Sequence, residues 1–110
     1  MPLNIEDRHN IKVIRLSGKI DFNNYSSFES DLEDLVEFGY LNFVFDLSKI
    51  EYLSSSGVMA LISIHKKIRE KSGKLVLVYI PDVVINILKN VKLDDLFEIY
   101  EDMEEALSAF

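Results

Sequence analysis

The sequence contains no cysteine and no long apolar run. Without cysteine, the protein cannot form disulfides, use a thiolate nucleophile or bind a metal through sulfur. A membrane-spanning helix needs roughly 18 consecutive apolar residues, and no segment of the chain approaches that length. The first seven residues also lack the basic and then apolar profile of a secretory signal. We therefore expect a cytoplasmic protein without a membrane span.

Positive charge is absent from the C-terminal end of the chain. The net charge of −7 comes entirely from residues 94–110, which hold seven acidic residues and no Lys or Arg. In the rest of the chain, 12 acidic residues balance 12 basic ones. Nucleic-acid binding requires a basic stripe that neutralises phosphates, so we expect no nucleic-acid partner. The acidic end is interpreted either as the solvated face of a helix or as a patch that meets a basic partner.

Residues for metal and nucleotide sites are also missing. The two histidines are isolated and the carboxylates are scattered, so no cluster has the spacing of metal ligands. The glycines stand alone at predicted turns, and no glycine-rich loop is present to hold a phosphate. We therefore expect neither a metal nor a cofactor. The four glycines are Gly18, Gly39, Gly57 and Gly73, and we expect Gly39 and Gly73 to end the first and second predicted helices.

A serine hydrolase is disfavoured as well. Its nucleophile elbow has the pattern Gly-x-Ser-x-Gly and needs a nearby base. Here Leu53, not glycine, lies two residues before Ser55. Of the two possible bases, His9 is expected in a flexible N-terminal segment, and His65 on the apolar stripe of a helix, two turns beyond the serines. The sequence therefore predicts a protein without enzymatic activity.

A chain of 110 residues fits a single domain, assigned to residues 1–110. Strand-like patterns occupy residues 11–16, 41–47, 75–80 and 97–100, and helical spacing occupies 25–38, 58–68, 82–91 and 103–110. Residues 48–56 are expected to form a loop, and the third helix is expected to bury Val83, Val84, Ile87, Leu88 and Val91. The alternation of strands and helices predicts a mainly parallel sheet with crossover helices.

Three serines and a glycine, residues 54–57, lie between a predicted strand with its loop and a predicted helix. We call this segment the serine turn. A serine hydroxyl at this position can cap the free N–H groups of the first helical turn, and capping alone is one interpretation. The other is phosphorylation, because the helix dipole would stabilise a phosphate on Ser55 while the charge changed an exposed loop. Gly57 would let a kinase or partner approach the backbone. The residues themselves leave both interpretations open.

Residues 46–58 resemble the central signature of the STAS domain, in particular that of bacterial anti-sigma factor antagonists. Residues 16–21, 73–77 and 93–100 resemble three further segments of that family in the same order, and the closing Glu-Glu-Ala-Leu helix follows. The resemblance covers nearly the whole chain. It implies a STAS-type α/β fold, with a mixed, mainly parallel sheet of four to five strands and about four helices packed mostly on one face.

The resemblance also implies a function in partner switching. Such antagonists bind an anti-sigma factor with serine kinase activity and thereby release a sigma factor. Phosphorylation by that kinase inactivates the antagonist until a PP2C-type phosphatase restores it. By position, the phosphorylated serine is Ser55, with Ser54 and Ser56 as competing acceptors. The implied partner-binding residues are Asp21, Ser54, Ser55, Ser56, Gly57 and the exposed Val58 and Met59.

The sequence departs from the family pattern at two positions. Ser54 stands where the family has Asp, and Lys92 stands where it has a glycine before the closing Leu-Asp pair. The first change removes a negative charge beside Ser55, whereas the second predicts a different end for the preceding helix. The alternative function is a ligand- or lipid-responsive STAS module in which the serines only cap the helix.

Overall fold

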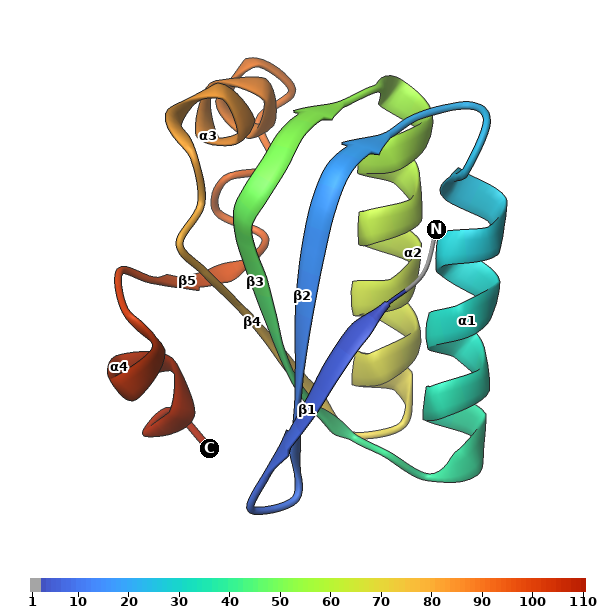
Figure 1. Ribbon diagram of the computed structural model, residues 1–110, viewed down its shortest axis with the longest axis vertical. Helices are drawn as coiled ribbons and strands as arrows, with labels where there is room; N and C mark the ends of the chain where they lie inside the picture. The colour runs from blue at the N-terminus through green and yellow to red at the C-terminus, as the bar shows by residue number, and fades with distance from the viewer. Residues whose placement is uncertain (1–2) are drawn as a thin grey trace.

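The computed structural model describes residues 3–110, so Met1 and Pro2 of the predicted domain lie outside the described residues. Its five-stranded sheet has the order β1-β2-β3-β4-β5 (Figure 1). Only β1 is antiparallel to its neighbour, which confirms the mixed, mainly parallel sheet. The strands are β1 Asn4–Arg8, β2 Ile11–Ile20, β3 Asn42–Leu53, β4 Lys74–Val78 and β5 Glu98–Tyr100. The helices are α1 Tyr25–Phe38, α2 Ser55–Glu70, α3 Asp82–Asn90 and α4 Met103–Leu107.

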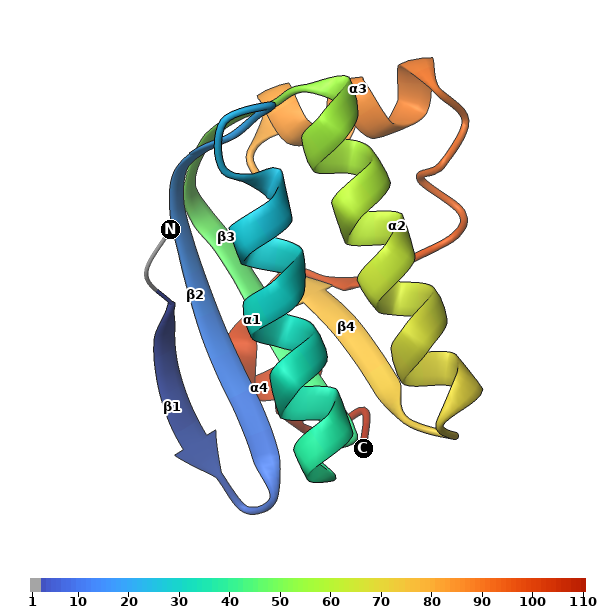
Figure 2. The ribbon, with the colours of Figure 1, turned by 90° about the vertical axis from the view of Figure 1, so that its right-hand side faces the viewer.

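Each face of the sheet carries its own apolar layer. Helices α1 and α2 lie side by side on one face, and α4 lies on the other (Figures 1 and 2). Because side chains alternate along a strand, Phe45 and Leu77 belong to the larger cluster under α1 and α2, while Val44 and Val76 pack against Ala106 of α4. The prediction of a strand at residues 75–80 is thus confirmed for β4, which ends at Val78 and is covered on both faces.

The predicted loop at residues 48–56 is wrong, because β3 continues to Leu53. Beyond the end of β4, this part of β3 still pairs with β2, where Ile20 lies opposite Leu53. Two register shifts interrupt the pairing, and the buried residues Ile50 and Leu53 are three positions apart. A bulged strand loses the strict alternation of polar and apolar residues. That loss explains why the sequence of this segment looks like a loop.

The N-terminal segment is also ordered, contrary to the expected flexible start. Strand β1 joins β2 through a tight turn in which His9 and Asn10 have φ angles of 50° and 71°. Positive φ at both central residues suits the twist of a two-residue hairpin. The β1 sequence is polar because it forms an exposed sheet edge, where Glu6 pairs with Arg15 of β2 at 3.0 Å. An edge strand without an apolar run gives little sequence signal.

The ends of α2 and α3 differ from expectation, whereas the end of α1 does not. Gly39 ends α1 with φ of 118°, as predicted. After α2, however, the left-handed residue is Ser72 rather than Gly73. Gly73 is instead needed for close packing, since an added Cβ would lie 2.3 Å from the Leu41 carbonyl oxygen. After α3, Lys92 itself adopts φ of 62°, the conformation that glycine adopts most easily.

Helix α3 buries a narrower stripe than predicted. Val84 and Leu88 are fully buried, whereas Val83 and Val91 are exposed. Positions four apart lie on one face of a helix, so a short helix at the end of the sheet buries one row of side chains. The final helix is likewise shorter than the predicted 103–110.

Candidate functional site

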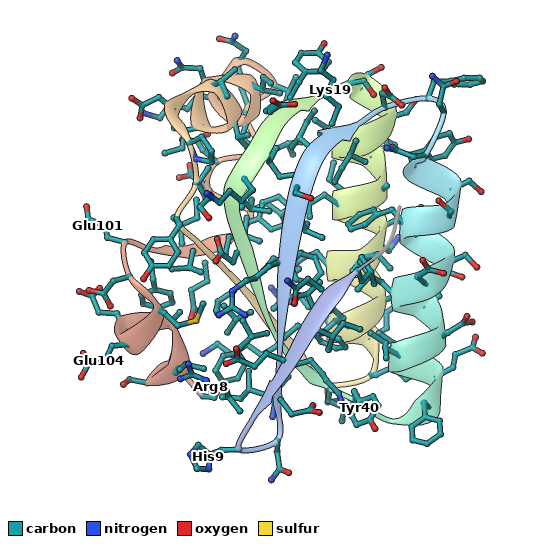
Figure 3. The ribbon with its side chains drawn as sticks, viewed as in Figure 1. Arg8, His9, Lys19, Tyr40, Glu101 and Glu104 are labelled. Atoms are coloured by element: carbon teal, nitrogen blue, oxygen red, sulfur yellow. The ribbon has the colours of Figure 1, made fainter. Side chains whose placement is uncertain are left out.

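The serine turn lies at the edge of the sheet where β2 and β3 both end. The Ser54 amide donates a 3.0 Å hydrogen bond to the carbonyl oxygen of Ile20, which joins the two strand ends. Figure 3 labels Lys19 at this end of the molecule, where α1 and α2 begin. The carboxyl ends of parallel strands meet at one edge and are a common location for binding sites.

Ser54 is the N-cap of α2, with extended backbone angles of φ −76° and ψ 175°. Its Oγ accepts a 3.2 Å hydrogen bond from the Gly57 amide and donates one of 3.3 Å to the Ile20 carbonyl oxygen. The hydroxyl is therefore used both as donor and as acceptor. For Ser54, the capping interpretation is correct.

Ser55 differs from Ser54 in both exposure and bonding, whereas Ser56 differs from it in bonding alone. Ser55 is the first residue of α2 and is exposed, and Ser56 is half-buried. Within residues 3–110, neither hydroxyl makes a hydrogen bond. The N–H groups of a first helical turn have no acceptor within the helix, and they favour a negative group placed nearby. The exposed Ser55 hydroxyl is thus available for modification without breaking a hydrogen bond of the fold.

A shallow groove of about 360 Å³ runs beside these serines between α1 and α2. No Lys or Arg is among the described residues that line it, and its one charged member is Glu29. Lys67 lies farther along α2 and is already paired with Glu29, at 3.7 Å, and with Glu33. A phosphate on Ser55 would therefore add its charge to a groove without an available cation. The lining residues are Tyr25, Glu29, Ser55, Ser56, Met59, Ala60 and Ser63.

The residues that follow the serines face in different directions. Met59 is 64% exposed, in agreement with its predicted position on the surface. Val58, however, is only 6% exposed, so its predicted exposure is wrong. Helical geometry turns Val58 and Leu61 toward the sheet and leaves Met59 outside. Gly57 is also buried, and it allows α2 to approach Ile20 rather than giving a partner access to the backbone.

Asp21 lies beside the serine turn, one residue after Ile20, as the resemblance implies. Its carboxylate accepts a 2.9 Å hydrogen bond from the Asn23 amide, and its carbonyl accepts one of 2.9 Å from the Tyr25 amide. Asp21 therefore shapes the turn that leads into α1. The same turn presents Phe22, which is 77% exposed and lies 6.0 Å from the Tyr25 ring.

Phe22 and Tyr52 are surface residues that the sequence reasoning missed. Both are exposed aromatic side chains near the ends of β2 and β3. The available signal was an apolar residue within the polar run Asp-Phe-Asn-Asn. Aromatic residues are enriched in protein interfaces.

No histidine is close to the serine turn. His65 lies ten residues along α2 from Ser55, which corresponds to about 15 Å at 1.5 Å per residue. His9 lies at the opposite end of the sheet (Figure 3). The serines therefore have no histidine within reach to act as a general base. Residues 3–110 also hold no group of three or more acidic or histidine side chains that could bind a metal.

His65 is itself buried, as expected for a histidine on the apolar stripe of a helix. Its ring packs edge to face against Phe97, with 4.9 Å between the ring centroids. Burial lowers the pKa of His65, and the nearby Arg69 cation lowers this pKa further. Both effects favour the neutral form of the imidazole. Separately, none of the helices described for residues 3–110 is both long and apolar enough to cross a membrane.

The fold and the serine turn together define a small α/β domain with a polar helix start at one sheet edge. Comparison with known proteins agrees: the family model for the STAS domain matches residues 2–106. The chain therefore belongs to the STAS domain family, which confirms the resemblance found in the sequence.

Individual relatives lead to the same family. The chain is 26% identical over 110 residues to BtrV of Bordetella bronchiseptica, described as a candidate anti-sigma factor antagonist, and the match covers all of this chain and 95% of that protein. A crystal structure of a candidate anti-sigma factor antagonist from Thermotoga maritima has a TM-score of 0.92 at 21% identity, with 97% and 92% coverage of the two chains. The anti-sigma factor antagonist SpoIIAA in its unphosphorylated form has a TM-score of 0.82 at 17% identity, with 98% and 95% coverage. These structural matches show a shared STAS fold.

Proposed function

We propose that this protein is an anti-sigma factor antagonist that acts by partner switching. In its unphosphorylated form it would bind an anti-sigma factor with serine kinase activity in the cytoplasm. Phosphorylation of Ser55 would end the binding, and a PP2C-type phosphatase would reverse the modification. The names of the relatives support this class of function. The observation that carries the proposal is the exposed, unbonded Ser55 hydroxyl on a turn whose shape is fixed by Ser54.

Hydrogen bonding distinguishes Ser55 from Ser54, and exposure distinguishes it from Ser56. Phosphorylating Ser54 would remove the hydroxyl proton that bonds to Ile20 and would disturb the cap on Gly57. Ser56 is half-buried against the groove. Ser55 is exposed and its hydroxyl makes no hydrogen bond, so its phosphorylation requires no rearrangement of the fold. Ser54 thus retains a capping function at the position where the family has Asp, since both side chains accept hydrogen bonds at an N-cap.

The phosphate would act through charge on the partner. It would bring about −1.5 to −2 charges to the groove beside Glu29, where the lining residues supply no cation. Without an Arg or Lys to bind it, the phosphate would stay at the surface and leave the fold intact. A partner surface that is acidic or apolar at this point would then be repelled.

The surface around Ser55 suits a protein partner. Met59 in α2 and Phe22 after β2 are exposed apolar side chains, and Asp21 immediately precedes Phe22 in the connection to α1. Aromatic and methionine side chains are enriched in protein interfaces. We include Asp21, Gly57 and Met59 in the proposed docking surface, with Gly57 contributing through its packing.

The experiment combines the protein with the anti-sigma kinase of the same organism and ATP, followed by phosphosite mapping by mass spectrometry. We expect one phosphate on Ser55 and none in Ser55→Ala, while Ser56→Ala is still modified. Size-exclusion chromatography should show a complex with the unmodified protein that is lost in Ser55→Asp. Ser55→Asn is the matched control, because it has a similar size without the charge.

Two results would contradict the proposal in different ways. If the kinase neither binds nor modifies the protein, the function as an antagonist is wrong. If Ser55→Asp binds as well as Ser55→Asn, the charge switch is wrong, and a ligand- or lipid-responsive STAS module with purely capping serines is favoured.

A further inference from the structure

Helix α3 carries two rows of aliphatic side chains, of which the fold buries only one. Val84 and Leu88 form the buried row. Val83, Ile87 and Val91 follow one another at intervals of four residues and form a second row along the helix and its C-cap. Val83 is 44% exposed, Val91 is 51% exposed and Ile87 is half-buried. We call these three residues the outer row.

An aliphatic outer row is unusual for a surface helix. Such a helix normally has one apolar stripe toward the core and polar residues on its other side. Single exposed apolar residues need no explanation, whereas contiguous ones mark interaction sites. The remaining exposed residues of α3 are all polar, namely Asp82, Asn86, Lys89 and Asn90. The outer row is therefore a separate apolar strip, and burying it against another apolar surface would be favourable.

Helix α3 is connected to the serine turn through the end of β3. The last residue of β4 lies opposite Asp46, whereas β3 continues to Leu53 and leads directly into Ser54. Helix α3 contacts β3, and Figure 1 shows it beside this extended end of the strand. Val84 belongs to the same apolar cluster as Leu53 and Val58, which lie before and after the serines. Figure 2 shows α3 crossing the end of the molecule at which α2 begins.

We infer that the outer row is a second contact for the partner that binds the serine turn, and that it docks on an aliphatic surface of that partner. A specific interface covers about 800 Å² on each side, contributed by roughly 20–30 residues. The residues proposed around Ser55 are too few to supply that area, so the partner must also cover neighbouring surface. Because it extends the docking surface for the same anti-sigma factor, this second contact rests on the proposed function.

The two contacts would have different tasks. Phosphorylation changes the charge at Ser55, whereas the outer row contains no charged or titratable side chain. Binding through the outer row is therefore insensitive to salt, which screens interactions between charges. The outer row would contribute affinity, and the serine turn would decide whether the complex persists.

Isothermal titration calorimetry with the anti-sigma kinase of the same organism tests the second contact. The double variant Val83→Gln/Val91→Gln removes the two exposed apolar side chains and should raise the Kd by about tenfold or more. The double variant Asn86→Gln/Asn90→Gln changes two exposed polar residues of the same helix and should bind as the wild type does. Because all four residues are exposed, both variants should keep the urea midpoint of the wild type.

Phosphorylation kinetics separate docking from the modification itself. A contact that is lost without any change at the reacting hydroxyl raises KM and leaves kcat unchanged. We therefore expect the Val83→Gln/Val91→Gln variant to have a KM about tenfold higher in the kinase reaction, with the wild-type kcat. A lower kcat at saturating antagonist would show that α3 alters the serine turn instead of docking the partner, and would overturn the inference.

The remaining outcomes distinguish this inference from the proposed function. If the wild type binds the kinase and Val83→Gln/Val91→Gln binds equally well, the second contact is wrong and the proposed function stands. If the wild type does not bind the kinase, the proposed function is wrong and the second contact falls with it. Analytical ultracentrifugation covers the last case, since a wild-type dimer that the variant lacks would show that a second copy of the chain covers the outer row.

Discussion

Gly57 packs directly against the main chain of Ile20, and a Cβ built on Gly57 would lie 2.4 Å from the Ile20 carbonyl oxygen. The same oxygen accepts hydrogen bonds from the amide and the hydroxyl of Ser54. One carbonyl at the end of β2 therefore positions the start of α2. The geometry of the serine turn depends on this contact between the end of a strand and the first turn of a helix.

Gly57→Ala should destabilise the protein because the clash is with backbone, which cannot rotate away. Overpacking of this kind costs about 1–3 kcal/mol in the free energy of unfolding, which urea denaturation followed by circular dichroism would measure. Ser55→Ala, two residues earlier and exposed, is the control and should change stability by less than about 0.5 kcal/mol. Equal stability of the two variants would show that α2 can shift away from β2 at no cost.

Ser54→Ala should reduce stability by about 1 kcal/mol, because the N-cap hydrogen bond to Gly57 is lost. Ser54→Asp should recover most of this loss, since a carboxylate also caps the helix and interacts favourably with its dipole. Urea denaturation of both variants beside the wild type tests the pair. A Ser54→Asp variant as unstable as Ser54→Ala would mean that the hydrogen bond donated to Ile20 matters more than the cap.

The stability of the protein should fall as the pH is lowered through the titration of His65. Burial lowers the pKa of this imidazole in the folded state, so the unfolded chain binds its proton at a higher pH. Below the ordinary histidine pKa of about 6.5, protonation therefore favours unfolding. The stabilisation is complete above that pH and is lost as the pH falls toward the folded-state pKa.

The test compares urea unfolding at about pH 8 and about pH 5, which bracket the ordinary histidine pKa. His65→Phe should lose less stability between these conditions than the wild type. His9→Asn is the control, because asparagine tolerates the positive φ of the exposed hairpin turn and removes the other histidine. Equal pH dependence of the wild type and His65→Phe would show that His65 does not contribute.

Lys92→Gly should stabilise the protein by up to about 1 kcal/mol, because the left-handed conformation at φ of 62° strains any residue with a Cβ. Lys89→Gly removes the same charge inside the exposed part of α3 and should have the opposite effect, a loss of about 0.5–1 kcal/mol. Thermal and urea unfolding of the two variants would measure the difference. A destabilised Lys92→Gly would indicate that its side chain contributes contacts that outweigh the strain.

The sequence was informative where burial follows a regular period. Phe28, Leu32 and Val36 recur at helical spacing, and the structure places all three in the core under α1. The apolar run at residues 75–78 likewise became the buried strand β4. It was less informative where the pattern is irregular, as in the bulged end of β3, or polar, as in the edge strand β1. In those segments, pairing with β2 determines the conformation.

The candidate site was predicted in part. Its position at the start of α2 follows from the serines and the glycine, which are typical of a helix start. Their separate roles could not be predicted, because one serine at an N-cap resembles the next in the sequence. The structure distinguishes them by hydrogen bonds across 34 residues, from Ser54 to Ile20, and leaves Ser55 unbonded and exposed.

By itself, the sequence determined the class of this protein: a STAS-type α/β domain with a helix that starts at a run of serines. These features depend on local periodicity and on short motifs, which need no partner distant in the chain. Only the tertiary structure decided which face each residue presents. The packing of distant segments determines that Val58 is buried, that Phe22 is exposed and that the ring nitrogens of His65 are unpaired. This packing cannot be predicted from the local sequence.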